Sequence, residues 1–222
     1  MSIKLSLLLL LTVPGLHSLA NGAVRLPNIV FVYTDDQAAW AMGAAVQQGW
    51  FADVPAAATP NMDRLAREGA VFTNFFCTTP VCSPARAAHI TGCYASELGI
   101  DDFIPMPGHK LYDADAQVAL DPDTTVTFAE VLQQKGYVTG LIGKWHLGDW
   151  TAAGNESQHP TNHGFDYFMG LTGGGAKPVD PELEEDGQVR QFKGLTTDIL
   201  TDRALDFIRR SKESPFLLCL HT

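Results

Sequence analysis

Apolar runs alternate with amphipathic stretches along most of the chain. Four apolar runs are rich in β-branched or aromatic residues and short enough for strands; they are residues 28–33, 70–76, 137–143 and 215–220. Amphipathic stretches that predict helices occupy residues 59–69, 127–136 and 195–210. This order predicts an α/β fold with a mostly parallel central sheet flanked by helices. We expect the run at 28–33 to be buried on both faces of that sheet.

Local signals support two of the helices. Thr59 stands as N-cap before Pro60, which fits the first helical position, and a glycine ends the stretch. Thr127 and Glu130 have the spacing of a capping box at the start of the second helix. The acidic stretch 180–187 is interpreted as a solvated loop.

The amino terminus has the layout of a secretory signal peptide. Lys4 precedes an apolar run at residues 7–11, and small residues lead to a cleavage site after Ala20. The run is too short to cross a bilayer, so we expect residues 1–20 to be removed and the rest to be exported. Export means the periplasm or secretion, or the lysosome in a eukaryote. An unusual buried first helix is the alternative, and no stable membrane span is expected elsewhere.

Composition narrows the class of partner. The 222 residues are 45% hydrophobic and 18% charged, which is typical of a globular protein. The net charge of −10 argues against nucleic acid or an anionic membrane as the main partner, but it leaves room for a small anionic substrate. An exported chain can form disulfides, and the pairing of four cysteines stays open; they are Cys77, Cys82, Cys93 and Cys219.

Two adjacent carboxylates, Asp35 and Asp36, follow the first predicted strand. In open α/β sheets, ligands bind at the carboxyl ends of the strands. Neighbouring carboxylates repel each other unless a cation neutralises them, and Ca²⁺ or Mg²⁺ prefers such oxygen ligands. The alternative is a pair of aspartates that caps the next helix.

The stretch 81–92 places a cysteine at a predicted helix start. Pro84 suits the first turn and Ser83 is a plausible cap, so Cys82 would lie just ahead of the helix. The amino terminus of a helix favours negative charge and lowers the pKa of a thiol. Arg86 lies one turn into the helix and can reach the same anion. A disulfide between Cys82 and a neighbouring cysteine is the alternative.

Lys144 and His146 follow the strand predicted at 137–143. Being two residues apart, they would point the same way in extended backbone. A cation and an imidazole at a strand end suit an anionic substrate and general acid catalysis.

These stretches together resemble the sulfatase family, which is formylglycine-dependent, arylsulfatase-like and part of the alkaline-phosphatase-like superfamily. Cys82, Pro84 and Arg86 are similar to its first signature, Cys-x-Pro-x-Arg, and residues 136–146 are similar to its second. The aspartate pair and residues 59–69 also match, so that the resemblance covers residues 27–220.

The resemblance implies a sulfuric ester hydrolase. In this family a maturation enzyme oxidises the signature cysteine, here Cys82, to formylglycine, and the hydrated aldehyde attacks the sulfur of a sulfate ester. It further implies that Asp35, Asp36 and residue 82 hold Ca²⁺, with Mg²⁺ as the alternative. Arg86 would stabilise the hydrated aldehyde, and the remaining two site residues, Lys144 and His146, would bind sulfate and assist the leaving alcohol. The substrate would be a sulfated small molecule or a glycan.

The match also has departures. His89 stands where the family usually has an apolar residue, and His221 comes too early to be the family's further sulfate-binding histidine, so it is interpreted as a strand-end histidine. We expect residues 21–222 to be the amino-terminal part of a sulfatase catalytic domain whose carboxy-terminal part is missing. The alternatives are a related phosphoester or phosphonate hydrolase and a non-catalytic truncated fragment.

Overall fold

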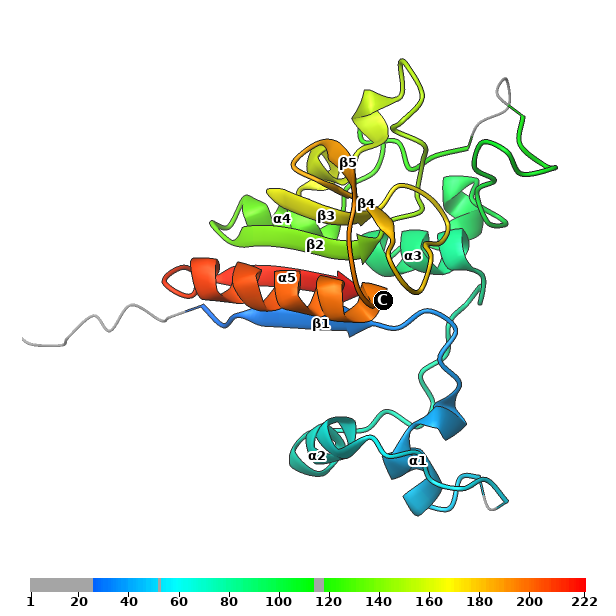
Figure 1. Ribbon diagram of the computed structural model, residues 1–222, viewed down its shortest axis with the longest axis vertical. Helices are drawn as coiled ribbons and strands as arrows, with labels where there is room; N and C mark the ends of the chain where they lie inside the picture. Colours follow the sequence, from blue (N-terminus) through cyan, green and yellow to red (C-terminus); the bar gives the residue numbers. More distant parts are fainter. Residues whose placement is uncertain (1–25, 52, 114–117) are drawn as a thin grey trace, which may run out of the picture.

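The computed structural model describes residues 26–51, 53–113 and 118–222, so the predicted signal peptide, residues 1–20, lies outside the described residues. Its centre is a six-stranded sheet of order β1-β6-β2-β3-β4-β5 (Figure 1). The strands are β1 (Ile29–Tyr33), β2 (Val138–Lys144), β3 (Tyr167–Leu171), β4 (Glu182–Glu185), β5 (Gln188–Gln191) and β6 (Phe216–His221). The first four in sheet order are parallel and the last two are antiparallel, which confirms a mostly parallel sheet.

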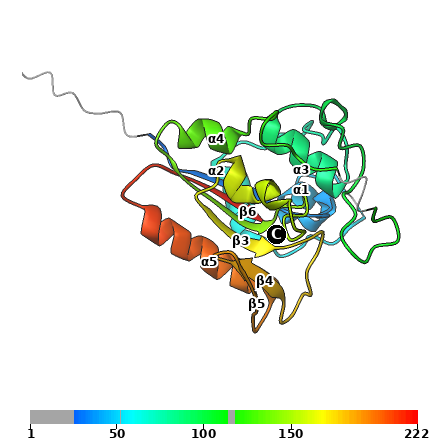
Figure 2. The same ribbon diagram turned by 90° about the horizontal axis from the view of Figure 1, so that it is seen from above.

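Helices cover both faces of this sheet. The α-helices are α1 (Gly43–Gln47), α2 (Pro60–Glu68), α3 (Cys82–Thr91), α4 (Phe128–Gln133) and α5 (Thr196–Ser211). Four 3-10 helices join them, at Ala39–Ala41, Ala95–Leu98, Glu156–Gln158 and Pro160–His163. Figure 2 shows α3 and α4 on one face and α5 on the other. No helix within the described ranges has the length and apolar character that crossing a bilayer requires.

Two apolar clusters hold the helices on the sheet. Alternate residues of β6 point into each: Leu217 and Cys219 pack on the α3 and α4 side, and Phe216 and Leu218 pack against α5. This period of two is what a strand covered on both faces requires.

The strand predicted at 28–33 exists as β1. The prediction that it is buried on both faces is wrong. Ile29 and Phe31 pack against the α3 and α4 side, whereas Val30 and Val32 are half exposed. The reason is position: β1 is the edge of the sheet, and α5 packs over β2, β3 and β6 instead.

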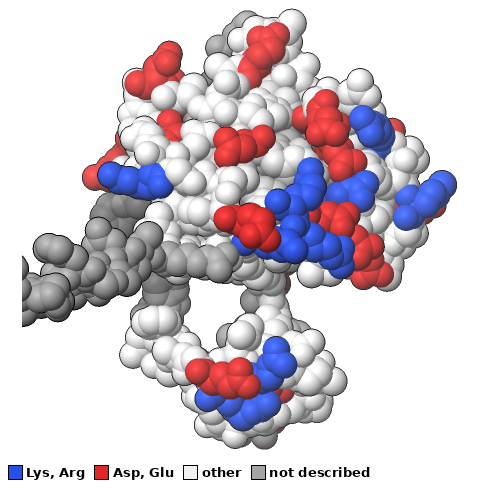
Figure 3. Space-filling view, turned by 90° about the vertical axis from the view of Figure 1, so that its left-hand side faces the viewer, with Lys and Arg blue, Asp and Glu red and all other residues white. Residues whose placement is uncertain are grey.

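The strand predicted at 70–76 is not formed. Residues 70–76 connect α2 to α3 and pair with no strand of the sheet, and the phenylalanines among them are exposed, Phe75 by 85%. They belong to a lobe around α1 and α2 that lies beside the sheet (Figures 1 and 3). Apolar composition alone therefore gave the wrong element here.

The solvated loop predicted at 180–187 is also wrong, because β4 occupies residues 182–185 of it. Asp186 and Gly187 have φ angles of 54° and 72° and form the two-residue turn to β5. Asp-Gly between two short strands is a strong hairpin signal, which the acidic composition masked. Leu183 is fully buried, so this acidic strand is part of the core.

The predicted helix starts are confirmed in position. Thr127 and Glu130 form the capping box of α4, with Thr127 Oγ1 accepting from the Glu130 amide. Thr59 precedes α2, but its hydroxyl bonds Asp63 and the Gly43 amide instead of capping its own helix.

The backbones of β2 and β3 leave no room for a side chain at Gly170. A Cβ there would overlap the carbonyl of Gly143 on the adjacent strand. We expect Gly170→Ala to lower the free energy of unfolding by about 2 kcal/mol. Gly175→Ala is the control, since a Cβ there meets no atom within 4 Å. Urea denaturation of both variants tests this, and equal stabilities would contradict the assigned pairing of β2 with β3.

Candidate active site

The carboxyl ends of β1, β2 and β6 meet at one edge of the sheet, next to the start of α3. Asp35 follows β1, Lys144 ends β2, and His221 ends β6 between them. Arg86 reaches the same place from the first turns of α3. Residues far apart in sequence thus converge where ligands bind in open α/β sheets.

One carboxylate oxygen holds two cations. Asp35 Oδ2 accepts from Arg86 Nη2 at 2.8 Å and from Lys144 Nζ at 2.9 Å. Burial would raise the pKa of Asp35, but the hydrogen bonds and charges of these two partners hold it below its usual value. The carboxylate therefore stays ionised, and two buried cations share it. A partial positive charge remains for an anionic ligand.

Further contacts fix the guanidinium of Arg86, which is only 2% exposed. Its Nη1 donates to the carbonyl of Lys144 at 2.9 Å and lies 3.1 Å from His221 Nδ1. Its carbon lies 5.2 Å from the centre of the Tyr33 ring, a cation–π distance. Arg86 is thus anchored before any ligand binds.

A cavity of about 480 Å³ opens beside this cluster. Its lining includes the predicted site residues Asp35, Asp36, Cys82 and Arg86, and also Cys77. The structure therefore brings the aspartate pair and the signature cysteine to one space. Lys144 lines a neighbouring cavity that also contains Asp35, so Asp35 lies between the two.

The helix starts two residues earlier than predicted. Cys82 is the first residue of α3 and Val81 is its N-cap. Ser83 is not the cap: it is fully buried, and its Oγ accepts from the Ile104 amide. The predicted placement of Cys82 at a helix amino terminus holds, with the cap one residue earlier than Cys82.

Lys144 and His146 are both buried at the end of β2, but not through extended backbone. His146 has a φ of 55°, so the prediction that both side chains point the same way in an extended strand is wrong. His146 Nε2 lies 2.8 Å from the Ile104 carbonyl, and Nδ1 has no partner among the described residues. Burial, together with Lys144 and Arg86, lowers the pKa of His146 to about 4, so its ring is neutral.

The side chains predicted as metal ligands provide oxygen atoms of the type that the metal requires. The Asp36 carboxylate has no hydrogen-bond or ion-pair partner within the described part of the chain, and its residue has a φ of 56°. Asp35 uses Oδ2 for both cations. Hard oxygens of this type suit Ca²⁺, but the described residues contain no cluster of three or more His, Cys, Asp or Glu placed around one position.

The cysteines are unpaired. All four thiols are free in the structure, so the disulfide alternative for Cys82 is not found. Cys219 is buried in β6, and burial raises the pKa of its thiol to about 12. The aspartates do not cap a helix either, because the next helical turn begins at Ala39 with Ala38 as its N-cap.

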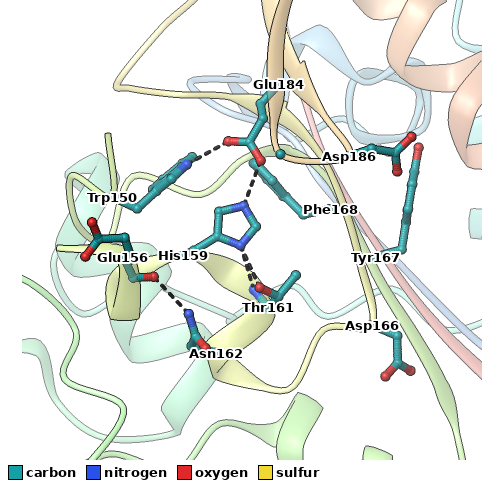
Figure 4. Close-up of a pocket in the computed structure, with 11 residues that line it drawn as sticks. Trp150, Glu156, His159, Thr161, Asn162, Asp166, Tyr167, Phe168, Glu184 and Asp186 are labelled. Atoms are coloured by element: carbon teal, nitrogen blue, oxygen red, sulfur yellow. Dashed lines mark hydrogen bonds and ion pairs between the residues drawn. The ribbon is translucent and has the colours of Figure 1, made fainter. Parts of the chain in front are cut away.

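A second cavity, between β4 and the loop after β2, contains none of the predicted site residues (Figure 4). Its deepest carboxylate, Glu184, accepts from Trp150 Nε1 at 2.7 Å and pairs with His159 Nε2 at 2.8 Å. His159 Nδ1 in turn contacts Thr161. Because these polar groups satisfy one another, the network anchors the β4–β5 hairpin and requires no ligand.

The chain is similar to known proteins over most of its length. A sulfatase family model matches residues 27–222. The N-acetylglucosamine-6-O-sulfatase of Bacteroides thetaiotaomicron is 35% identical over 226 residues, covering 97% of this chain and 34% of its own length. The N-acetylgalactosamine-6-sulfatase of Mus musculus is 32% identical over 232 residues, covering 95% of this chain and 42% of its own.

Solved structures agree in fold. The crystal structure of Ps i-CgsB superposes with a TM-score of 0.73 at 27% identity, over 88% of this chain and 44% of that one. A protein solved in complex with its substrate D-glucosamine-2-N,6-O-disulfate gives a TM-score of 0.64 at 34% identity, over 88% of this chain and 34% of its own. The chain thus spans between a third and a half of the length of these relatives.

The shared carboxylate predicts unequal roles for the two aspartates. Asp35→Asn would leave buried Arg86 without its counter-charge, so we expect the free energy of unfolding to fall by about 1–2 kcal/mol, allowing for the 35% exposure of the Asp35 side chain. Asp36→Asn is the matched control and should change stability by less than about 0.5 kcal/mol. Urea denaturation at pH 7 in the presence of a chelator measures both; equal losses would show that the ion pairs of Asp35 contribute nothing particular.

Proposed function

Because the chain belongs to the sulfatase family, we propose that the cavity beside Asp35 is the sulfate-ester site of a sulfuric ester hydrolase. One observation carries this proposal: Arg86 and Lys144 converge on a single carboxylate, that of Asp35, which lines that cavity. Two cationic donors held there suit the oxygens of a sulfate group.

Cys82 is proposed as the position of the nucleophile. It begins a ten-residue helix, where unpaired amide groups and the helix dipole favour a developing negative charge. A formylglycine at this position would supply a geminal diol, one hydroxyl of which attacks sulfur while the other later releases sulfate. Its formation requires a maturation enzyme as a partner. The partly exposed side chain of Cys82 lines the cavity, as a nucleophile must.

The other residues bind and orient. Arg86, fixed by Asp35 and the Lys144 carbonyl, would hold the oxygens of residue 82 in place. The Lys144 ammonium would bind a sulfate oxygen. His146, neutral and with its buried Nδ1 unpaired among the described residues, would accept a hydrogen bond from the residue-82 hydroxyl or lie beside the leaving alcohol.

Asp35, Asp36 and residue 82 would hold Ca²⁺, with Mg²⁺ as the alternative. When bound, the ion supplies polarisation of the sulfate oxygens. The two carboxylates would contribute only some of the roughly six to eight oxygens that Ca²⁺ prefers.

The best-supported substrate class is a sulfated sugar. The relatives named above act on N-acetylglucosamine and N-acetylgalactosamine 6-sulfates by their names, and one neighbour was solved with a disulfated glucosamine. We extend this class to the whole protein to which the chain belongs. We also propose that it is exported, as its first residues predict.

The proposal predicts an aldehyde at position 82. Expressed together with a sulfatase maturation enzyme, the chain should give a tryptic peptide, residues 68–86, in which residue 82 has lost sulfur and gained oxygen. Cys77 lies in the same peptide and is the internal control, because it lacks the signature and should keep its thiol. Fragment mass spectrometry locates the change.

Arg86→Lys tests the signature further and should abolish most of the conversion while leaving the peptide intact. A thiol at position 82 in the wild-type chain, under conditions that convert an established sulfatase, would remove Cys82 from the nucleophile role.

A further inference from the structure

A buried imidazole lies directly against Arg86. His221 ends β6 and is 2% exposed. Its Nδ1 lies 3.1 Å from Arg86 Nη1 and 3.0 Å from the carbonyl oxygen of Lys144. Since Nη1 also donates to that carbonyl at 2.9 Å, the three groups form a closed triangle of short contacts.

We propose that His221 is a positioning residue, whose Nδ1 atom fixes the guanidinium of Arg86 against the end of β2. In this role it acts through Arg86. The effect of this positioning on sulfate binding rests on the proposed function, whereas the contact between His221 and Arg86 does not.

The ring contributes as a neutral hydrogen-bonding group. Burial, and then the charge of Arg86, lowers the pKa of His221 to about 3, so the imidazole carries no charge at neutral pH. In one tautomer Nδ1 accepts from Arg86 Nη1, and in the other it donates to the Lys144 carbonyl. Only the first tautomer, with the ring proton on Nε2, holds Arg86, and it is the one that the proposal assigns to His221.

The rest of the ring is enclosed by aromatic side chains. Tyr33 lies 5.5 Å away between ring centres and His89 lies 6.1 Å away. His89 is itself stacked on Phe31 at 4.1 Å. The Nε2 atoms of both histidines are buried and have no hydrogen-bond partner among the described residues. His221 therefore uses its polar capacity at Nδ1 alone, on the side of Arg86.

This arrangement pre-organises a flexible side chain. An arginine has several rotatable bonds, and holding it costs conformational entropy that a ligand would otherwise have to offset. Asp35 fixes Nη2, while the Lys144 carbonyl and His221 fix Nη1. Without His221, Nη1 keeps a single acceptor, the Lys144 carbonyl, and the guanidinium is held by one contact fewer.

Two amide variants distinguish the effect of the Nδ1 contact with Arg86 from the effect of burying a polar side chain at position 221. His221→Asn places an amide near the position of Nδ1, whereas His221→Gln places it near Nε2. Both variants carry the same polar group into the same buried site. The readouts are the Nη proton–nitrogen NMR signals of Arg86, assigned with Arg86→Lys, and the affinity for inorganic sulfate by calorimetry.

We expect the wild-type chain and His221→Asn to show slowly exchanging Arg86 Nη signals and sulfate Kd values within about twofold of each other. His221→Gln should lose these signals and bind sulfate about tenfold more weakly, which is the effect of one hydrogen bond to a charged group. Rescue by Asn and not by Gln is an outcome that simple core packing does not produce.

Unchanged signals and affinity in His221→Gln would overturn the proposal. If neither variant folds, the wild-type chain decides alone, through the nuclear Overhauser contact between the Arg86 Nη protons and the His221 ring; its absence refutes the assignment. The positioning role of His221 and the proposed sulfatase function can be refuted independently of each other. A permanent thiol at Cys82 would remove the proposed chemistry and leave these signals as they are.

Discussion

The carboxylate of Asp35 is the constraint on which the candidate site depends. Buried Arg86 cannot be left unpaired, because an isolated cation in a protein interior costs several kcal/mol. Its counter-charge stands after β1 and is shared with Lys144 at the end of β2, although β6 separates those two strands. The ion pairs therefore span three strands and α3, and they set the position of each strand end relative to the helix.

Much of this architecture follows from the sequence. The apolar runs that became β2 and β6, and the capping box of α4, depend on local preferences that the fold does not override. Residues 70–76 are the counterexample: their aromatic content resembles a strand, but the lobe around α2 offers no sheet edge to pair with. For β4, the acidic composition of the segment led to the prediction of a loop. The segment is a hairpin, whose turn is formed by Asp186 and Gly187 with positive φ angles.

The sequence predicts which residues lie at the candidate site, but it does not predict which of them bond to one another. Strand ends in a parallel sheet share one edge, so the aspartate pair and Lys144 had to lie near each other. The partners were not readable, because the choice of Asp35 over Asp36 depends on one left-handed residue. From the sequence, His221 is interpreted only as a strand-end histidine. Its contact with Arg86 appears only once β6 is placed between β1 and β2.

The position of β6 has a consequence for how the chain is made. Ile29 pairs with Leu217, so the first described strand finds its neighbour only when the last described strand has been synthesised. Until then β1 and β2 lack the strand that joins them, and their apolar edges stay open to chaperones and to mispairing. Formation of the ion-pair cluster is thus a late folding event. The stretch that contains Cys82 is synthesised well before β6, and it spends that interval without the contacts that the end of β6 makes with Arg86.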